Sequence, residues 1–103
     1  MINCLREGKI VYQQNGVTGR FLQKGPGFEL LKLEIEAGIT LAPHLVDFAA
    51  EFLVIAGRGR YIYQQEEVTV GKDCLVSAST KTSRGFINEG KEVMEILVIK
   101  HQN

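Results

Sequence analysis

The segment Glu29–Glu36, with the sequence ELLKLEIE, decides the class of fold. Apolar and charged side chains alternate along it, and the apolar ones are Leu31, Leu33 and Ile35. Because successive side chains of a β-strand point to opposite faces, this alternation predicts a strand with one face on a core and the other in water. Lys32 is therefore expected on the solvent side.

Similar short runs recur along the chain, and turn signals such as Asn15-Gly16 and Gly25-Pro26-Gly27 separate them. These runs are Lys9–Gln13, Gly19–Gln23, Thr40–Pro43, Phe52–Ala56, Arg60–Gln64, Glu67–Val70, Leu75–Ala78, Arg84–Asn88 and Val93–Lys100. About ten short strands at roughly ten-residue spacing predict an all-β sandwich or barrel. Phe52–Ala56 and Ile96–Ile99 do not alternate, and they are interpreted as strands covered on both faces.

Composition limits the classes of partner. The chain has 103 residues, which fits one domain, and its 12 Lys+Arg balance its 12 Asp+Glu. A net charge of zero argues against binding to nucleic acid or to an anionic membrane surface. No apolar run approaches the ~20 residues that span a bilayer, and the amino terminus carries no export signal. We therefore expect a cytoplasmic protein in which Cys4 and Cys74 are reduced.

Two motifs stand out in the second half of the chain. The first, at about residues 38–57, has Gly38, then His44 after five intervening residues, then Glu51 and Gly57. The second, at about residues 71–90, closes on Asn88. Together they resemble the two motifs of the small single-domain cupins. The resemblance covers nearly the whole chain, so it implies one domain over residues 1–103. The fold that it implies is a double-stranded β-helix, also called a jelly-roll barrel.

The resemblance also implies that this chain differs from metal-binding cupins at the positions of the metal ligands. Metal-binding cupins hold a divalent ion with three His and one Glu, and the chain keeps His44 of those histidines. Val46 stands at the second His position and Arg84 at the third. Glu51 falls at the Glu position when counted from His44, whereas Ala50 takes it when counted back from Gly57.

The chemistry of these residues predicts no metal and no cofactor. Val46 has no lone pair to donate, and the guanidinium of Arg84 is always charged and cannot ligate a cation. Strand parity and the resemblance together predict a ligand-binding pocket. Its residues are His44, Val46, Glu51, Arg84, Phe86 and Asn88.

Arg84 needs a partner if it is buried, and two partners are possible. Glu51 could pair with it as a structural bridge, or Arg84 could clamp a ligand carboxylate or phosphate with His44 as a second donor. The first functional hypothesis is a cupin-fold module that binds a small anionic molecule, such as a carboxylate or sugar acid. The second is a metal-dependent isomerase or dioxygenase that uses His44 and Glu51.

A third hypothesis is a structural or sensory partner protein. Whichever holds, we expect a homodimer, because the exposed edges of a β domain need cover. The strand Lys9–Gln13 or the strand Val93–Ile99 could supply the joining edge.

Overall fold

A computed structural model describes residues 4–102, and β-strands account for most of them. A short 3₁₀ helix, Leu5–Glu7, comes before the first strand. The strands are β1 (Lys9–Gln14), β2 (Val17–Gly25), β3 (Phe28–Ile35), β4 (Thr40–Val46), β5 (Ala50–Ala56), β6 (Arg58–Tyr63), β7 (Glu66–Gly71), β8 (Leu75–Ala78), β9 (Thr82–Asn88) and β10 (Met94–His101). Within the described range, no helix is long and apolar enough to cross a membrane.

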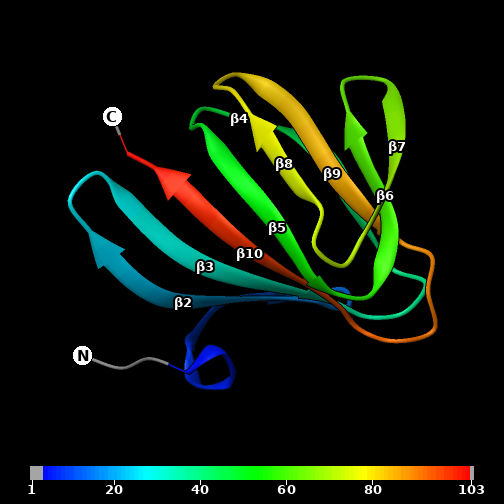
Figure 1. Cartoon of the computed structure of the whole chain (residues 1–103), viewed down its shortest axis with the longest axis horizontal. Coiled ribbons are helices and arrows are strands. Elements are labelled where there is room, and N and C mark those ends of the chain that lie inside the picture. Colours follow the sequence, from blue (N-terminus) through cyan, green and yellow to red (C-terminus); the bar gives the residue numbers. More distant parts are fainter. Residues whose placement is uncertain (1–3, 103) are drawn as a thin grey trace.

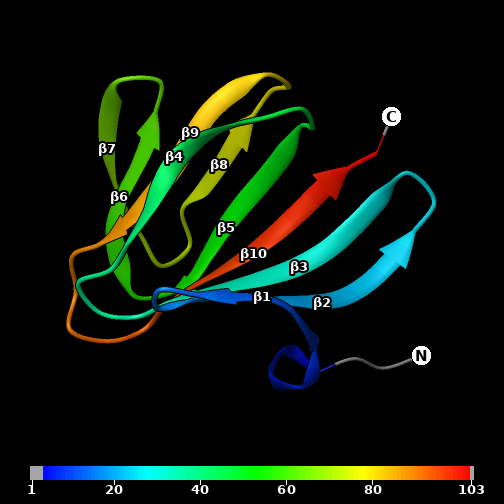
Figure 2. The same ribbon diagram turned by 180° about the vertical axis from the view of Figure 1, so that it is seen from behind.

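The strands form two antiparallel sheets that face each other (Figures 1 and 2). The six-stranded sheet has the order β1-β2-β3-β10-β5-β8, and the four-stranded sheet has the order β4-β9-β6-β7. Each run identified in the sequence corresponds to a strand of the structure, and the predicted and observed ends differ by a few residues. The all-β prediction is therefore confirmed.

The turn between β1 and β2 shows why the hairpin signals were informative. Asn15 has a φ of 51° and Gly16 a φ of 82°. A two-residue hairpin loop that matches the strand twist needs positive φ at both positions, and Asn-Gly adopts that conformation with little strain. The dipeptide thus sets the register that pairs Gln14 with Val17.

The core lies between the sheets and is filled by alternate residues of the central strands. On β10, Met94, Ile96 and Val98 are buried, whereas Leu97 and Ile99 are only half-buried on the outer face. The prediction that the strands 52–56 and 96–99 are covered on both faces is therefore wrong. On β5, Leu53 and Ile55 are likewise only half-buried.

The outer face of β3 holds a second departure from prediction. Lys32 is 2% exposed, although the alternating pattern placed it in water. Its Nζ atom lies 3.2 Å from Oε2 of Glu34 and also contacts the carboxylate of Glu95 on β10. Arg20 on β2 approaches Glu34 at 3.1 Å. Long side chains on adjacent central strands cover the lysine stem, and the two carboxylates neutralise its charge.

The sheet order decides which strands are free edges. β10 pairs with both β3 and β5, as Figure 1 shows, so the prediction that Val93–Ile99 could join a second subunit is wrong. β1 is an edge of the six-stranded sheet, and all six of its residues are exposed. Ile10, Val11 and Tyr12 are large apolar residues on that edge.

Candidate functional site

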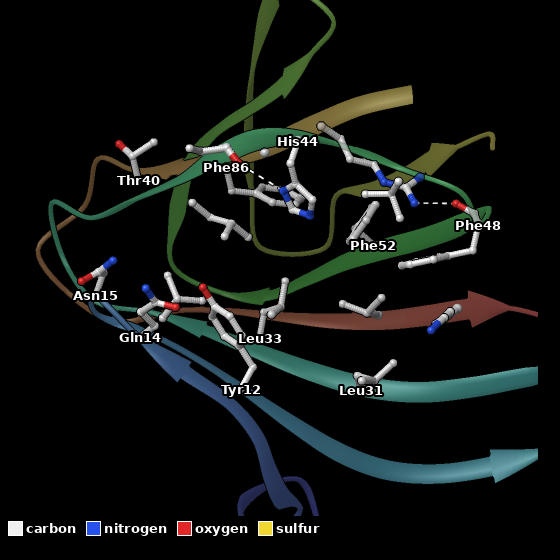
Figure 3. A pocket seen from close by; sticks show the side chains of 18 residues that line it. Tyr12, Gln14, Asn15, Leu31, Leu33, Thr40, His44, Phe48, Phe52 and Phe86 are labelled. Atoms are coloured by element: carbon white, nitrogen blue, oxygen red, sulfur yellow. Dashed lines mark hydrogen bonds between the residues drawn. The ribbon is translucent and has the colours of Figure 1, made fainter. Parts of the chain in front are cut away.

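A cavity of about 620 Å³ lies between the two sheets (Figure 3). Its walls come from β1, β3, β4, β9 and β10, with single contributions from the β1–β2 turn, β2, β5 and the loop after β4. Tyr12 on β1 and His44 on β4 line the cavity and are also exposed. The cavity therefore opens to solvent between the edge strands of the two sheets.

Four of the six residues predicted for the pocket line this cavity: His44, Val46, Arg84 and Phe86. His44 and Arg84 are opposite each other in the β4–β9 pairing. The register shifts between Leu41 and His44, so β4 bulges at this point.

Gly85 allows that bulge to lie close to β9. A Cβ atom at Gly85 would lie 2.4 Å from the carbonyl oxygen of Leu41 and 2.7 Å from the nitrogen of Pro43. Only a residue without a side chain fits this approach of the two backbones. The cavity wall formed by β4 thus depends on a glycine.

Arg84 is the most unusual of the lining residues. It is 3% exposed, and its Nη2 atom donates to the carbonyl oxygen of Phe48 at 2.5 Å, while Nη1 donates to that of Ser79 at 3.4 Å. Its guanidinium carbon lies 5.0 Å from the ring centroid of Phe48 and 5.6 Å from that of Phe52. Burial lowers the pKa of Arg84, and the nearby Tyr61 partly offsets this.

Among residues 4–102, no acidic side chain neutralises this guanidinium. Arg84 forms no ion pair there, so the bridge to Glu51, one of its two possible partners, is absent. Backbone carbonyls carry only partial negative charge, so those of Phe48 and Ser79 accept from two of the five N–H donors without cancelling the full positive charge. The positive charge therefore stays uncompensated beside the cavity.

Glu51 lies on the other face of β5. Its Oε1 atom is 2.5 Å from Nε2 of His101, whereas its neighbours Ala50 and Phe52 are buried in the core. The placement of Glu51 in the pocket is therefore wrong, because strand alternation turns its side chain outward. The count back from Gly57, which assigns the inward position to Ala50, agrees with the structure.

Asn88 does not line the cavity either. It is 1% exposed, and its side-chain amide donates to the carbonyl oxygens of Ile35 and Glu92 at 2.8 Å each. Its Oδ1 atom accepts a hydrogen bond from the backbone N–H of Gly90 at 2.9 Å. The side chain thus ties the end of β3 to the loop between β9 and β10, and the pocket prediction for Asn88 is wrong.

The donor set does not fit a divalent metal. His44 supplies an imidazole whose Nδ1 atom is 3.2 Å from the carbonyl oxygen of Ala42, but Val46 and Arg84 supply no lone pair. In the part of the chain that the structure describes, no group of three or more His, Cys, Asp and Glu side chains converges. The positive charge of Arg84 would also repel a cation.

Sequence reasoning missed a second cation at the same end of the cavity. Lys100 lines the cavity, and its Nζ atom lies 4.5 Å from the ring centroid of Phe48, the ring that Arg84 also contacts. The sequence does indicate the inward position of Lys100, because this residue continues the series of every second residue formed by Met94, Ile96 and Val98 on β10. Strand parity places it on the inward face.

Sequence reasoning also missed the polar residues at the opposite end. Figure 3 shows Gln14, Asn15 and Thr40 at one end of the cavity and Phe48 at the other. Tyr12 reaches into the cavity from below, on the side of the polar residues (Figure 3). Apolar side chains form much of the remaining lining, and they include Val17, Leu31, Leu33, Phe52, Phe86 and Val98. His44 lies among them, beside Phe86 (Figure 3).

Comparisons with known proteins agree on the fold. No protein-family model matches the sequence, and no curated protein matches it. Three solved structures illustrate the likeness. A predicted oxalate decarboxylase from Thermotoga maritima is 13% identical with a TM-score of 0.88 over 100% of each chain.

An RmlC-like cupin from Shewanella frigidimarina is 9% identical with a TM-score of 0.82, over 95% of this chain and 86% of that one. The polyketide cyclase RemF from Streptomyces resistomycificus is 18% identical with a TM-score of 0.80, over 95% and 76% of the two chains. The protein therefore has the cupin fold, as its motifs led us to expect. Cupin-fold neighbours differ in activity, so the fold alone assigns no reaction.

Proposed function

We propose that this cupin-fold chain binds a small anionic molecule in the cavity between its sheets, without a tightly held metal. The observation that carries the proposal is Arg84, which is 3% exposed, lines the cavity and forms no ion pair within residues 4–102. A buried charge is costly unless an opposite charge compensates it. An anionic ligand would supply that charge.

Lys100 strengthens the case for an anion. It and Arg84 both contact the ring of Phe48, so two positive charges lie at one end of an apolar cavity. Low-dielectric walls focus such a field and favour a negatively charged guest. A planar carboxylate also matches the fork of N–H donors on a guanidinium, three of which are not used by Phe48 and Ser79.

The experiment is isothermal titration with 2-naphthoate, oxalate, glucuronate and phosphate against the wild-type protein. At least one anion should bind, and Arg84→Gln should weaken that binding about 10- to 100-fold, because hydrogen bonds to charged groups contribute about 1.5–3 kcal/mol. Arg58→Gln is the matched control, because Arg58 is exposed and outside the cavity lining. Circular dichroism checks that each variant folds.

If Arg84→Gln fails to fold, Lys100→Gln replaces it and should weaken the same binding. The proposal is wrong if no anion binds, or if both cavity variants leave every affinity unchanged. A structural or sensory role would then be favoured. Metal-dependent catalysis is the other alternative, and stoichiometric Zn, Ni, Mn or Fe in protein purified without chelators would support it against the proposal.

A further inference from the structure

The two ends of the cavity differ in chemistry, and this difference indicates what shape and charge a ligand would need. One end has Arg84 and Lys100 about the ring of Phe48. The other end has Gln14 and Thr40, which Figure 3 shows on the far side of the cavity from Phe48. A molecule that satisfies both ends must be elongated, with an acidic group at one end only.

Apart from His44, the walls between the two ends are mainly apolar and disfavour a highly polar guest. They include Leu31, Leu33 and Val98 on the six-stranded sheet and Phe86 on β9. The rings of Phe52 and Phe86 meet edge to face, with centroids 5.3 Å apart and an interplanar angle of 70°. Hydroxyl groups of a sugar acid would lose their water here and gain few partners, whereas an apolar or aromatic body would be stabilised by burial.

The volume of the cavity also favours a larger guest. About 620 Å³ falls within the ~300–1,000 Å³ typical of pockets for drug-sized molecules. Oxalate or phosphate would fill a small part of it and would leave the apolar walls in contact with water. A body of one or two fused rings would cover those walls.

The far end is polar but carries no charge. Tyr12 contributes a phenol, Gln14 and Asn15 contribute amides, and Thr40 contributes a hydroxyl. No Asp, Glu, Lys or Arg of the described residues lines this end of the cavity. Neutral groups that both donate and accept suit a hydroxyl or carbonyl on the ligand rather than a second carboxylate.

From this arrangement we infer that the ligand is an elongated carboxylic acid with an apolar, ring-containing body and a hydroxyl or carbonyl at its other end. The inference rests on the proposed function, because it assigns the carboxylate to Arg84 and Lys100. The body lies against the rings of Phe52 and Phe86. The distal oxygen meets Tyr12 at the mouth of the cavity.

The test is isothermal titration of the wild-type protein with four probes of graded chemistry. They are 6-hydroxy-2-naphthoate, 2-naphthoate, 2-naphthalenemethanol and glucuronate. The hydroxylated naphthoate should bind about three- to tenfold more tightly than 2-naphthoate, because it adds one neutral hydrogen bond. Glucuronate, which lacks the apolar body, and 2-naphthalenemethanol, which lacks the charge, should each bind at least about tenfold more weakly than 2-naphthoate.

Variants then assign the ends. Arg84→Gln should weaken both naphthoates by the same factor, whereas Tyr12→Phe should weaken only 6-hydroxy-2-naphthoate and bring it to the level of 2-naphthoate. Tyr63→Phe is the matched control, because Tyr63 is outside the cavity lining and should change neither affinity. Tyr12 is 45% exposed on an edge strand, so its variant is expected to fold.

The outcomes separate this inference from the proposed function. If glucuronate binds as tightly as 2-naphthoate and depends on Arg84, the anion site stands and the apolar body is wrong. If Tyr12→Phe weakens both naphthoates equally or neither, the assignment of the distal end is wrong. If none of the acids binds, the proposed function itself fails.

Discussion

The hydroxyl of Tyr61 lies in the core between the sheets and has no hydrogen-bonding partner among residues 4–102. The residue is 4% exposed, and its ring centroid lies 6.2 Å from that of Phe52 and 5.1 Å from that of Phe86. A buried polar group left unsatisfied costs about 1–3 kcal/mol. Tyr61→Phe keeps the ring and removes the hydroxyl, so it should raise the free energy of unfolding by about 1–2 kcal/mol.

Thermal unfolding followed by circular dichroism at pH 7 measures this gain. For a domain of this size, 1 kcal/mol corresponds to a change in Tm of roughly 4–8 °C. Tyr12→Phe is the control, because its hydroxyl is on the exposed strand β1, and its effect should be within about 0.5 kcal/mol. A Tyr61→Phe protein less stable than the wild type would refute the reasoning, since the hydroxyl would then have a partner such as a bound water.

The same residue predicts how stability changes at alkaline pH. Burial raises the pKa of Tyr61, and the charge of Arg84 only partly offsets this. The unfolded chain ionises first, so the contribution to stability is complete below pH ~10 and is lost as pH rises through the folded-state pKa. Urea unfolding between pH 9 and 11 should show a steeper loss for the wild type than for Tyr61→Phe, and equal slopes would contradict the assignment.

Three further perturbations test other parts of the fold. Burial alone would raise the pKa of Glu34, but hydrogen bonds from Arg20 and Lys32 lower the pKa overall. The contribution of Glu34 to the free energy of unfolding is therefore present above about pH 4.5 and is lost as pH falls through the lowered pKa. Glu34→Gln should therefore flatten the acid limb of a urea-unfolding profile, and an unchanged limb would count against the network. Gly85→Ala should cost about 1–3 kcal/mol by thermal unfolding, whereas Gly71→Ala, with nothing nearer than 3.8 Å to the added Cβ, should cost less. We propose that two copies associate through the β1 edge, so light scattering should give a dimer. Val11→Lys on β1 should dissociate the dimer, whereas the control Val68→Lys, on the edge strand β7, should not. A wild-type monomer at micromolar concentration would end this proposal.

The fold was predictable because its signals are local. Alternation along residues 29–36 and the positive-φ turn at Asn15-Gly16 each depend on a few neighbouring residues, and both predict what the structure has. Lys32 was not predictable in the same way. Its burial depends on Glu95 from β10, and no pattern within β3 indicates which strand lies beside it.

The candidate site was predictable only where strand parity was unambiguous. His44 and Arg84 were placed on the cavity wall from motif spacing, but the side of Glu51 depended on which end of the motif was counted. The partners of Arg84 left no signal at all, because they are backbone carbonyls of Phe48 and Ser79, and every residue has a carbonyl. Only the folded arrangement of the two loops brings them to the guanidinium.

The position of β10 has a consequence for how the protein is made. It is the last strand described along the chain, yet it lies between β3 and β5 in the middle of the larger sheet. A ribosome therefore releases the hairpins of β1, β2 and β3 well before the strand that joins them to β5. Until residues 94–101 emerge, the nascent chain exposes the inward faces that Ile96 and Val98 later cover, and this interval is when aggregation or chaperone binding would compete with folding.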